Sequence, residues 1–409
     1  MSTEDKSFTM TPFMSEWLAG GHPSNQLPIS AVCNSHCLFC SNHLNPFPAA
    51  GGFFRDVEDI KLQLCAMSAH DDPIRMSDSL PGRISEGEAL LHPQLFEILE
   101  LVRRKFFYNT LCFTTNASML DPVFLKKLSA FRPMEINVSL HSTEPALWAH
   151  IFGQDTRKAE IAIASLPLLR AQKIDLIGTL VPLPKICGWE GLERTYAHLI
   201  AQGARSMILY WPGHTHLTRP EVLADLECSL TEFTDFSERM KAAFRVPLIP
   251  HPDMVSPLQI RVETIVAKTL KGNPKNRGGA YREVVWLSSV AAFCRLESLV
   301  KEKTLSAPNL HQVEPVENGT YGGNIMAAGL LMVEDFIHAG KKVLERQPEV
   351  ELFLVPREPF DSLLRDLQGT PAYMIAEDLG RPVWLVNPHG GIDPLLSPRL
   401  VTRRDSINA

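Results

Sequence analysis

Three cysteines near the N-terminus have a spacing that suits iron chemistry. Cys33, Cys37 and Cys40 follow the pattern C-x3-C-x2-C, directly after the short apolar run 27–32. A [4Fe-4S] cluster that is held entirely by protein takes four thiolates, and a single loop with this spacing supplies three. No fourth cysteine lies nearby in the sequence. The spacing therefore predicts a [4Fe-4S] cluster with one iron open to an outside ligand, much as a catalytic metal keeps an open position.

Other interpretations of these cysteines stay open. A zinc ion would need a fourth ligand, which His36 or His43 could supply. A disulfide with a spare thiol is disfavoured if the chain is cytoplasmic, where thiols stay reduced. The remaining five cysteines lack the spacing of ligand pairs, and we expect each to be a small buried apolar side chain: Cys65, Cys112, Cys187, Cys228 and Cys294.

The stretch 31–43, AVCNSHCLFCSNH, resembles the cluster loop of the radical S-adenosylmethionine (SAM) superfamily. That family has this spacing with an aromatic residue before the third cysteine, and Phe39 fills the place. The resemblance implies a [4Fe-4S] cluster whose open iron binds the amino and carboxylate groups of SAM. It also implies that an electron from the cluster cleaves a C–S bond of SAM homolytically, and that Phe39 lies near the adenine.

A second segment, Glu86-Gly87-Glu88-Ala89, resembles the GGEP motif of the same family, with its first glycine and its proline replaced. In that family the strand end binds the amino group of SAM, mainly through backbone carbonyls. Glycine suits such a position because it lets the backbone come close to a ligand. An ordinary strand-to-helix turn is the other interpretation of Gly87 and Glu88.

Strand-like and helix-like segments alternate through the first part of the chain. We expect strands at 27–32, somewhere within 70–85, and at 110–115, 134–141, 174–181 and 206–211, separated by helical patterns. Such alternation indicates βαβ units with a parallel sheet. The sequence therefore predicts an α/β fold, and six such units fit the partial (β/α)6 TIM-like barrel that is typical of the family.

Further candidate residues lie at the ends of these strands, where barrel enzymes place their chemistry. Asn116 resembles the asparagine of the family's TNG motif, although Ala117 replaces the glycine. Ser139 matches the position at which the family often binds the SAM ribose, and His141 ends the same strand. We expect all three to contact the cofactor, although Asn116 and Ser139 could equally be ordinary polar groups at strand ends.

The loop 211–221, WPGHTHLTRPE, follows the sixth expected strand and carries His214 and His216. Histidine can transfer a proton, contact an anion or bind a metal near neutral pH. Both residues are therefore candidate catalytic groups at the barrel mouth, although a loop histidine is more often simply solvated.

We expect three segments in the domain organisation: a lead-in over 1–26, the barrel over 27–245, and a mixed α/β domain over 246–409 that begins with a proline-rich linker, 246–257. Because a radical has to be shielded from water, we expect the second domain to cover the barrel mouth. Within it we expect strands at 259–266, 284–294, 324–333, 350–355 and 383–386, and helices at 334–345 and 360–368.

The stretch 318–340 of the second domain is its most distinctive part. It resembles an uncharacterised domain that follows some radical SAM barrels, with matches at Asn318, Tyr321-Gly322, 326–331 and Asp335. That resemblance implies no substrate. The turn Tyr321-Gly322-Gly323 could cradle an anion, although a glycine-rich turn is more often only a turn.

The charge and composition of the chain restrict the classes of partner that we expect it to bind. The 409 residues carry a formal net charge of -6, with no basic run of the kind that binds nucleic acid. No apolar run approaches a membrane span, and the first residues resemble neither a signal nor a transit peptide. We therefore expect a cytoplasmic protein without a nucleic-acid or membrane partner.

The leading hypothesis is a radical SAM enzyme that acts on a small molecule or a peptide and draws electrons from a flavodoxin- or ferredoxin-type donor. One alternative is transfer of the 3-amino-3-carboxypropyl group of SAM to an acceptor. An alternative from another class is a non-catalytic iron–sulfur carrier or electron-transfer protein. Such a carrier would not need the EGEA turn or six βα units.

Overall fold

The computed structural model describes residues 25–40, 53–67, 71–77, 86–251, 260–272, 280–307, 309–361 and 363–395. Most of the expected lead-in, His43 and part of the expected linker lie outside these ranges. The chain forms two compact units: Met1–Gly213 with Thr218–His251, and His214–Leu217 with Pro252–Ala409. The chain thus passes between the units after Gly213, after Leu217 and after His251.

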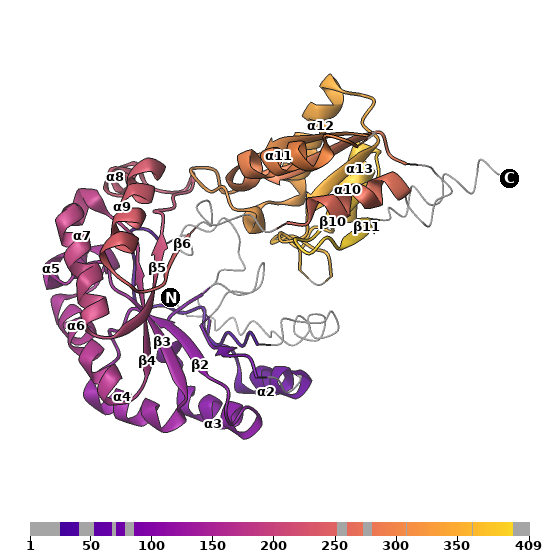
Figure 1. Ribbon diagram of the computed structural model, residues 1–409. Coiled ribbons are helices and arrows are strands. Elements are labelled where there is room, and N and C mark those ends of the chain that lie inside the picture. The colour runs from indigo at the N-terminus through magenta and orange to yellow at the C-terminus, as the bar shows by residue number, and fades with distance from the viewer. Residues whose placement is uncertain are drawn as a thin grey trace, which may run out of the picture. The chain divides into compact units, whose positions relative to one another are not determined.

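The first unit contains a curled sheet of six parallel strands in the order β1 to β6, with helices on its outer face (Figure 1). This arrangement confirms the predicted α/β partial barrel. The strands are β1 (Ile74–Arg75), β2 (Leu111–Thr115), β3 (Met134–Ser139), β4 (Asp175–Leu180), β5 (Ala204–Tyr210) and β6 (Leu248–His251).

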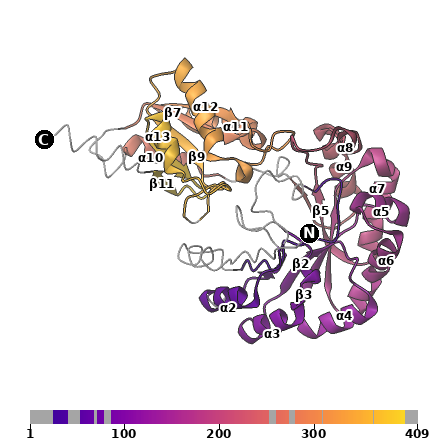
Figure 2. The ribbon, with the colours of Figure 1, turned by 180° about the vertical axis from the view of Figure 1, so that it is seen from behind.

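The view from behind shows the same helices following the outside of the arc (Figure 2). They are α2 (Val57–Ala66), α3 (Leu95–Lys105), α4 (Pro122–Leu128), α5 (Pro145–Phe152), α6 (Thr156–Ala171), α7 (Pro184–Ala201), α8 (Pro220–Asp225) and α9 (Leu230–Ala243), with short 3-10 turns η2 (Ala89–Leu91) and η3 (Ser129–Phe131).

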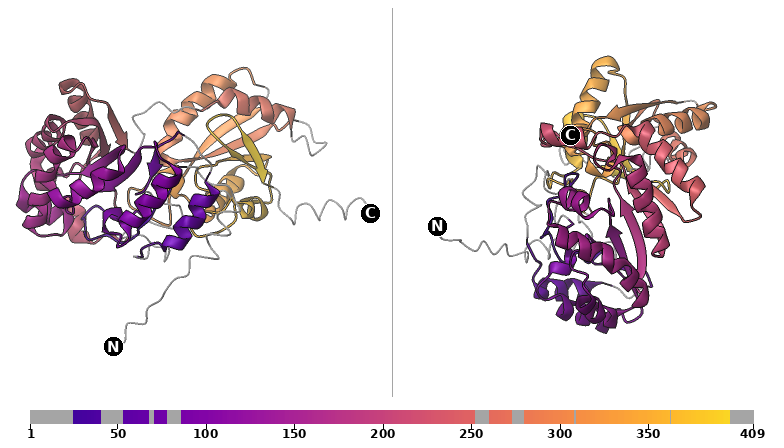
Figure 3. Two further views of the ribbon diagram at one scale, coloured as in Figure 1. Left: turned by 90° about the horizontal axis from the view of Figure 1, so that it is seen from below. Right: turned by 90° about the vertical axis from the view of Figure 1, so that its left-hand side faces the viewer.

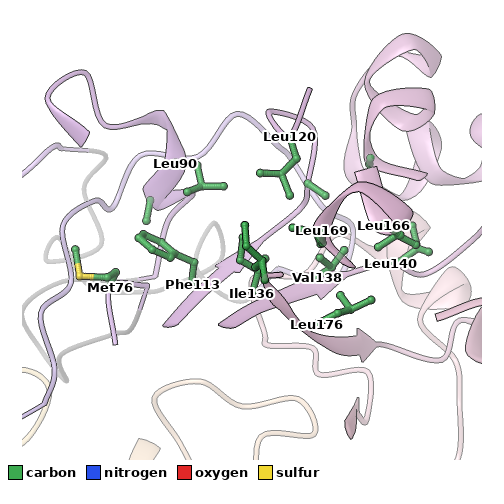
Figure 4. Packing of buried hydrophobic residues seen from close by; sticks show 14 of the residues in the cluster. Met76, Leu90, Phe113, Leu120, Ile136, Val138, Leu140, Leu166, Leu169 and Leu176 are labelled. Atoms are coloured by element: carbon green, nitrogen blue, oxygen red, sulfur yellow. The ribbon is translucent and has the colours of Figure 1, made fainter. Parts of the chain in front are cut away.

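Side chains alternate along each strand, which separates the apolar core under the outer helices from the inner face of the sheet. Successive side chains of a strand point to opposite faces, and in β3 Ile136 and Val138 are fully buried while Ser139 is half-buried. Figure 4 shows Ile136 and Val138 within the apolar packing, near Leu166 and Leu169 of α6. The inner face is therefore left for the more polar set that includes Ser139.

Two expectations for the ends of this sheet were wrong. The run 27–32 is not a regular strand: it lies beside β1 through a single bridge from Gln26 to Arg75 and hydrogen bonds from Leu27 and Ile29. The sixth strand is instead Leu248–His251, within the expected linker. Pro250 is tolerated there because β6 is an edge strand, where a missing N–H costs no ladder bond.

The second unit contains five strands in the order β11-β10-β9-β7-β8, parallel except for β11. They are β7 (Glu283–Ser289), β8 (Leu310–Val316), β9 (Leu352–Pro356), β10 (Val383–Val386) and β11 (Ile392–Leu395). The unit is thus the predicted mixed α/β domain.

Helices cover both faces of this second sheet, which can be followed in Figure 3. Val285 and Leu287 of β7 belong to a core shared with α12 (Val333–Arg346) and α13 (Tyr373–Leu379). Val284 and Trp286 belong to a separate core shared with α10 (Val262–Lys271) and α11 (Val290–Thr304). The second unit is therefore a three-layer sandwich with two cores of its own.

Several expectations inside this unit need correction. Strands at 350–355 and 383–386 and a helix at 334–345 are confirmed. The strand expected at 259–266 was wrong, because Val262, Ile265, Val266 and Thr269 are buried on one side of helix α10, at helical spacing. Of the strand expected at 284–294, only 284–289 is extended, and the rest belongs to helix α11. The stretch 324–333 holds the 3-10 turn η5 (Ala328–Leu330) instead of a strand, and the helix expected at 360–368 does not form.

The scattered cysteines also differ from expectation. Cys228 is buried as predicted, and Cys112 and Cys187 are partly buried. Cys65 and Cys294 are exposed, so the prediction of a buried apolar role was wrong for both. Among the described helices, none is both long and apolar enough to cross a membrane.

Helices α12 and α13 make a tight contact that gives a test of the second unit. Gly340 lies in α12, and a Cβ placed there would lie 2.5 Å from Cδ1 of Leu379. We predict that Gly340→Leu lowers the free energy of unfolding by about 1–3 kcal/mol, because overpacking forces neighbours out of place. Chemical denaturation measures the change. Lys341→Leu, at the exposed neighbouring position, is the control, and equal stability of the two variants would contradict this packing.

Candidate functional site

The cysteine loop continues directly from the segment that lies beside β1. The N–H groups of Leu27 and Ile29 donate to the carbonyl oxygens of Arg75 and Met76, and both side chains are fully buried. The chain then leaves the sheet and carries Cys33, Cys37 and Cys40 beyond its carboxyl edge. The buried apolar run thus fixes where the loop begins.

Gly87 lies against the start of this loop so closely that it has no room for a side chain. A Cβ at Gly87 would lie 2.5 Å from the carbonyl oxygen of Val32 and 2.6 Å from the carbonyl carbon of Ala31. The N–H of Gly87 donates to Ser30 at 3.1 Å, and that of Glu88 donates to Val32 at 2.8 Å. The glycine of the EGEA segment is therefore required by backbone-to-backbone packing.

The Glu88 side chain joins this turn to the end of β2. One carboxylate oxygen accepts the Thr115 hydroxyl and the Asn116 N–H, both at 2.9 Å, and the other accepts the N–H of Leu90 at 3.4 Å. Glu88 is only 2% exposed, and this burial raises its pKa to about 7 despite the three donors. Its carboxylate is thus occupied in holding the site together.

Asn116 extends the same hydrogen-bond network to the cysteine loop. Its amide nitrogen donates to the Asn34 side-chain oxygen and to the Ser35 hydroxyl, both at 2.8 Å. Gln154, after α5, also donates to Ser35. The loop is therefore clamped between the end of β2 and the end of α5, and Asn116 positions the loop that carries the cysteines.

Ala117 adopts the left-handed conformation, with φ of 62°. For a residue with a Cβ this costs roughly 1–2 kcal/mol. The turn is held by hydrogen bonds from Ala117 N–H to Thr115 and from Ser118 N–H to Asn116, both at 2.9 Å. These hydrogen bonds help to hold alanine in a conformation that favours glycine.

An aromatic cluster supports the loop from behind. Phe39 meets His141 edge-on at 4.6 Å between ring centres, and His141 stacks on Phe152 at 5.0 Å. His141 is fully buried, its Nδ1 accepts the N–H of Val181 at 3.0 Å, and burial lowers its pKa to about 3. His141 is thus a neutral ring that positions Phe39, and the pocket described next does not include it.

Seven of the predicted residues line one pocket of about 120 Å³ at the carboxyl ends of β2 and β3. They are Cys33, Cys37, Phe39, Gly87, Glu88, Asn116 and Ser139. Ser139 faces the pocket, and its hydroxyl makes no hydrogen bond within the described residues, so it is free to bind a ligand. Strands far apart in the sequence thus bring the predicted set together.

Burial disfavours the thiolate forms of Cys33 and Cys37. It raises the pKa of Cys33 to about 11 and that of Cys37 above its usual value, and neighbouring cysteines in the loop raise both further. A bound metal centre would supply the positive charge that holds such thiols as thiolates. Three cysteines on one loop, with a ligand pocket at two of them, therefore fit an iron–sulfur cluster.

The described residues do not form a site for one metal ion. Within that part of the chain, no group of three or more His, Cys, Asp or Glu side chains is placed to hold a single ion. Thiolates that bind different irons of a cluster stand further apart than ligands around one ion. His43, a possible zinc ligand, lies outside the described residues.

His214 and His216 are not among the residues that line this pocket, and they belong to the segment His214–Leu217 that is grouped with the second unit. The N–H of His214 donates to the Asn324 side chain at 2.7 Å, and the His216 ring contacts the Tyr321 carbonyl at 2.8 Å. The glycine-rich turn is needed here, because a Cβ at Gly323 would lie 2.1 Å from the His214 carbonyl oxygen. The turn thus holds a loop, and the catalytic role of the histidines stays a prediction.

Sequence reasoning missed Ser35, Thr115 and Gln154 as parts of the site. Ser35 lies between two cysteines, so its polar side chain within the loop could have been noted. Thr115 precedes Asn116 at the end of β2, where a strand-end hydroxyl is a modest signal. Gln154 has no local signal, since it meets the cysteine loop only in the folded chain.

Comparison with known proteins finds one protein family whose model matches part of the chain. Residues 27–190 match the family model of the Radical SAM superfamily, whereas no curated protein matches the chain. The resemblance of the second unit to the uncharacterised domain that follows some radical SAM barrels stays a prediction.

Three solved structures illustrate the structural likeness. Streptococcus suis SuiB bound to S-adenosylmethionine has 12% identity and a TM-score of 0.43, over 57% of this chain and 52% of SuiB. SuiB bound to the precursor peptide SuiA has 12% identity and a TM-score of 0.44, over 59% and 53%. A radical SAM methyltransferase from Sphaerobacter thermophilus has 14% identity and a TM-score of 0.40, over 56% and 67%. The chain spans about half the length of SuiB, and such likeness identifies no substrate.

The close approach at Gly87 generates a prediction. We expect Gly87→Ala to displace the cysteine loop, because the added methyl would meet immobile backbone atoms of Ala31 and Val32. The variant should bind markedly less iron than the unmodified chain after anaerobic reconstitution, measured as iron and sulfide per chain. Gly191→Ala, with no atom nearer than 3.6 Å to the new Cβ, is the control. Full iron content in Gly87→Ala would show that the loop does not depend on this contact.

Proposed function

Residues 27–190 belong to the radical SAM superfamily, and we propose that the chain is an enzyme that cleaves SAM reductively and starts radical chemistry on a small molecule or a peptide. The observation that carries the proposal is the single pocket that joins Cys33 and Cys37 to Gly87 and Ser139. An iron–sulfur carrier has no use for such a pocket beside its cysteines. This favours the enzyme over the carrier.

The residues of the chain have separate tasks in this proposal. Cys33, Cys37 and Cys40 hold a [4Fe-4S] cluster, which supplies one electron for homolytic cleavage of a C–S bond when it is bound together with SAM. The backbone of the Gly87–Glu88 turn, which lines the pocket, receives the SAM amino group, and Ser139 binds the ribose.

Two further residues complete the cofactor site in this proposal. Phe39, supported by His141, lies beside the adenine. Asn116 keeps the cysteine loop in register with the pocket.

The reaction needs an electron donor, and we propose a protein of the flavodoxin or ferredoxin type. A cytoplasmic setting suits an oxygen-sensitive cluster and free thiols. The net charge of -6 is consistent with a substrate other than nucleic acid. His214 and His216 are proposed to serve the substrate, not SAM, since their segment belongs to the second unit.

The products of SAM separate the two possible reactions. We predict that the anaerobically reconstituted protein with SAM and dithionite releases 5'-deoxyadenosine and methionine, and that Cys37→Ala releases neither, since one ligand of the cluster is lost. Chromatography of a single-turnover mixture measures them. Stoichiometric 5'-methylthioadenosine would instead support aminocarboxypropyl transfer, and the absence of any SAM binding would support the carrier.

Ser139 gives a test of the ribose contact. Ser139→Ala should weaken SAM binding by about 0.5–1.5 kcal/mol, the usual net contribution of a hydrogen bond, without loss of iron. Calorimetric titration of SAM into the reconstituted protein measures the change. Ser142→Ala is the matched control, because its hydroxyl accepts the Glu144 N–H and lies outside the pocket. Equal losses of SAM affinity in both variants would show that Ser139 does not bind SAM.

We further propose that the second unit shields the reaction from solvent, as lids do in many enzymes. A chain truncated after His251 should then lose its cluster to oxygen faster than the full chain, since the shield is missing. The bleaching rate of the cluster's visible absorption in aerated buffer measures this. Equal rates in two folded proteins would contradict a shielding role.

A further inference from the structure

We propose that the second unit holds a ligand site of its own, at the carboxyl ends of β7 and β9, for one flat heteroaromatic ring that carries both an N–H and a carbonyl edge. The site lies wholly within this unit and does not rest on the chemistry proposed for the first unit. Four features support it: the strand topology, the splaying of two strands, a cavity between them, and the polar groups at its rim.

The topology creates a crevice between β7 and β9. The chain runs from β7 through α11 to β8, and α11 lies on one face of the sheet. It then returns through α12 to β9, and α12 lies on the opposite face. The two connections leave the sheet in opposite directions, and in open α/β sheets ligands bind outside the carboxyl ends of the strands at such a reversal.

The two strands separate at this end. Their pairing covers only Val284 with Leu352, Val285 with Phe353, and Trp286 with Leu354. β7 nevertheless continues to Ser289, paired with β8 along its whole length, and β9 continues to Pro356. The last residues of β7 and β9 therefore have no partner in each other, which opens the sheet at the reversal.

A cavity of about 110 Å³ occupies this opening. Its walls are mainly apolar, and include Leu354 and Pro356 of β9, Val386 of β10, and Ala292 and Leu296 of α11. An apolar cavity of roughly 150 Å³ accommodates benzene, so this smaller space can take one ring at most and excludes a larger ring system.

The segment that resembled a known domain forms one wall of this cavity. Ala328 of η5 lines it, and the carbonyl of Met326 accepts the N–H of Ala291 at 3.3 Å, at the start of α11. A larger side chain than alanine would enter the space. The cavity thus gives a reason for the small side chain at Ala328, in a segment that does not form a strand.

The polar groups at the rim define the ring's chemistry. Ser288 and Ser289 end β7. The Ser288 hydroxyl donates to the Ser289 carbonyl, whereas the Ser289 side chain does not cap α11, so its hydroxyl can donate to a carbonyl of a ligand. Glu358 lies on the same cavity and can accept an N–H. A phosphate, the usual ligand of a helix N-terminus, would be repelled by this carboxylate.

Ligand-observed NMR with the full chain tests the site, with uracil as the probe and toluene as a ring without polar edges. We expect uracil to give saturation-transfer signals, Ala292→Phe to abolish them by filling the cavity, and Glu358→Gln to weaken binding at least tenfold. Glu334→Gln, at an exposed position of α12, is the matched control and should bind as the unmodified chain does.

The outcomes separate the parts of the proposal. Equal binding of toluene and uracil would contradict the proposed recognition of a polar ring edge. Absence of uracil binding would contradict the site itself, and so would uracil binding that persists in Ala292→Phe. If Ala292→Phe does not fold by circular dichroism, Glu358→Gln decides alone, because Glu358 is at the rim. Release of 5'-deoxyadenosine tests the proposed SAM cleavage in the first unit, whereas uracil binding tests the cavity in the second. A failure of one proposal is therefore distinguishable from a failure of the other.

Discussion

The absence of a side chain at Gly87 is the constraint on which the candidate site depends. The turn that carries Gly87 and the chain that leads into the cysteine loop are joined backbone to backbone, and any Cβ would separate them. The glycine thus does more than expose backbone to a ligand. It sets the distance between the loop that holds the three thiols and the strand end that completes the pocket, so one contact fixes the relative position of both parts of the candidate site.

A buried hydrogen-bond network extends this constraint across the sheet. Glu88 holds the end of β2, and Asn116 at that end holds Ser35 in the cysteine loop. Burying a carboxylate is costly, and three donors to Glu88 offset the cost only in part, as its raised pKa shows. The network ties three segments that are distant in the sequence, so Glu88 and Asn116 act on the cysteines by fixing the position of their loop.

The second unit follows the same physical rule in a different sheet. In both units, polar or small residues gather where parallel strands end, while apolar packing covers the outer face of the first sheet and both faces of the second. In the first unit those ends carry thiols and hydroxyls. In the second they surround a mainly apolar cavity with serines and a glutamate at its rim. The two pockets are therefore chemically distinct.

The sequence by itself determined the three cysteines, the βαβ alternation and most strand-end candidates, because these depend on local spacing and periodicity. Only the tertiary structure decided that Asn116, after β2, holds the cysteine loop through Ser35. The same is true of the contact between His141 and Phe39, and of the place of the His214 segment in the second unit. It also replaced the first expected strand by a proline-containing edge strand. These outcomes depend on contacts between residues far apart in the chain, which local patterns do not encode.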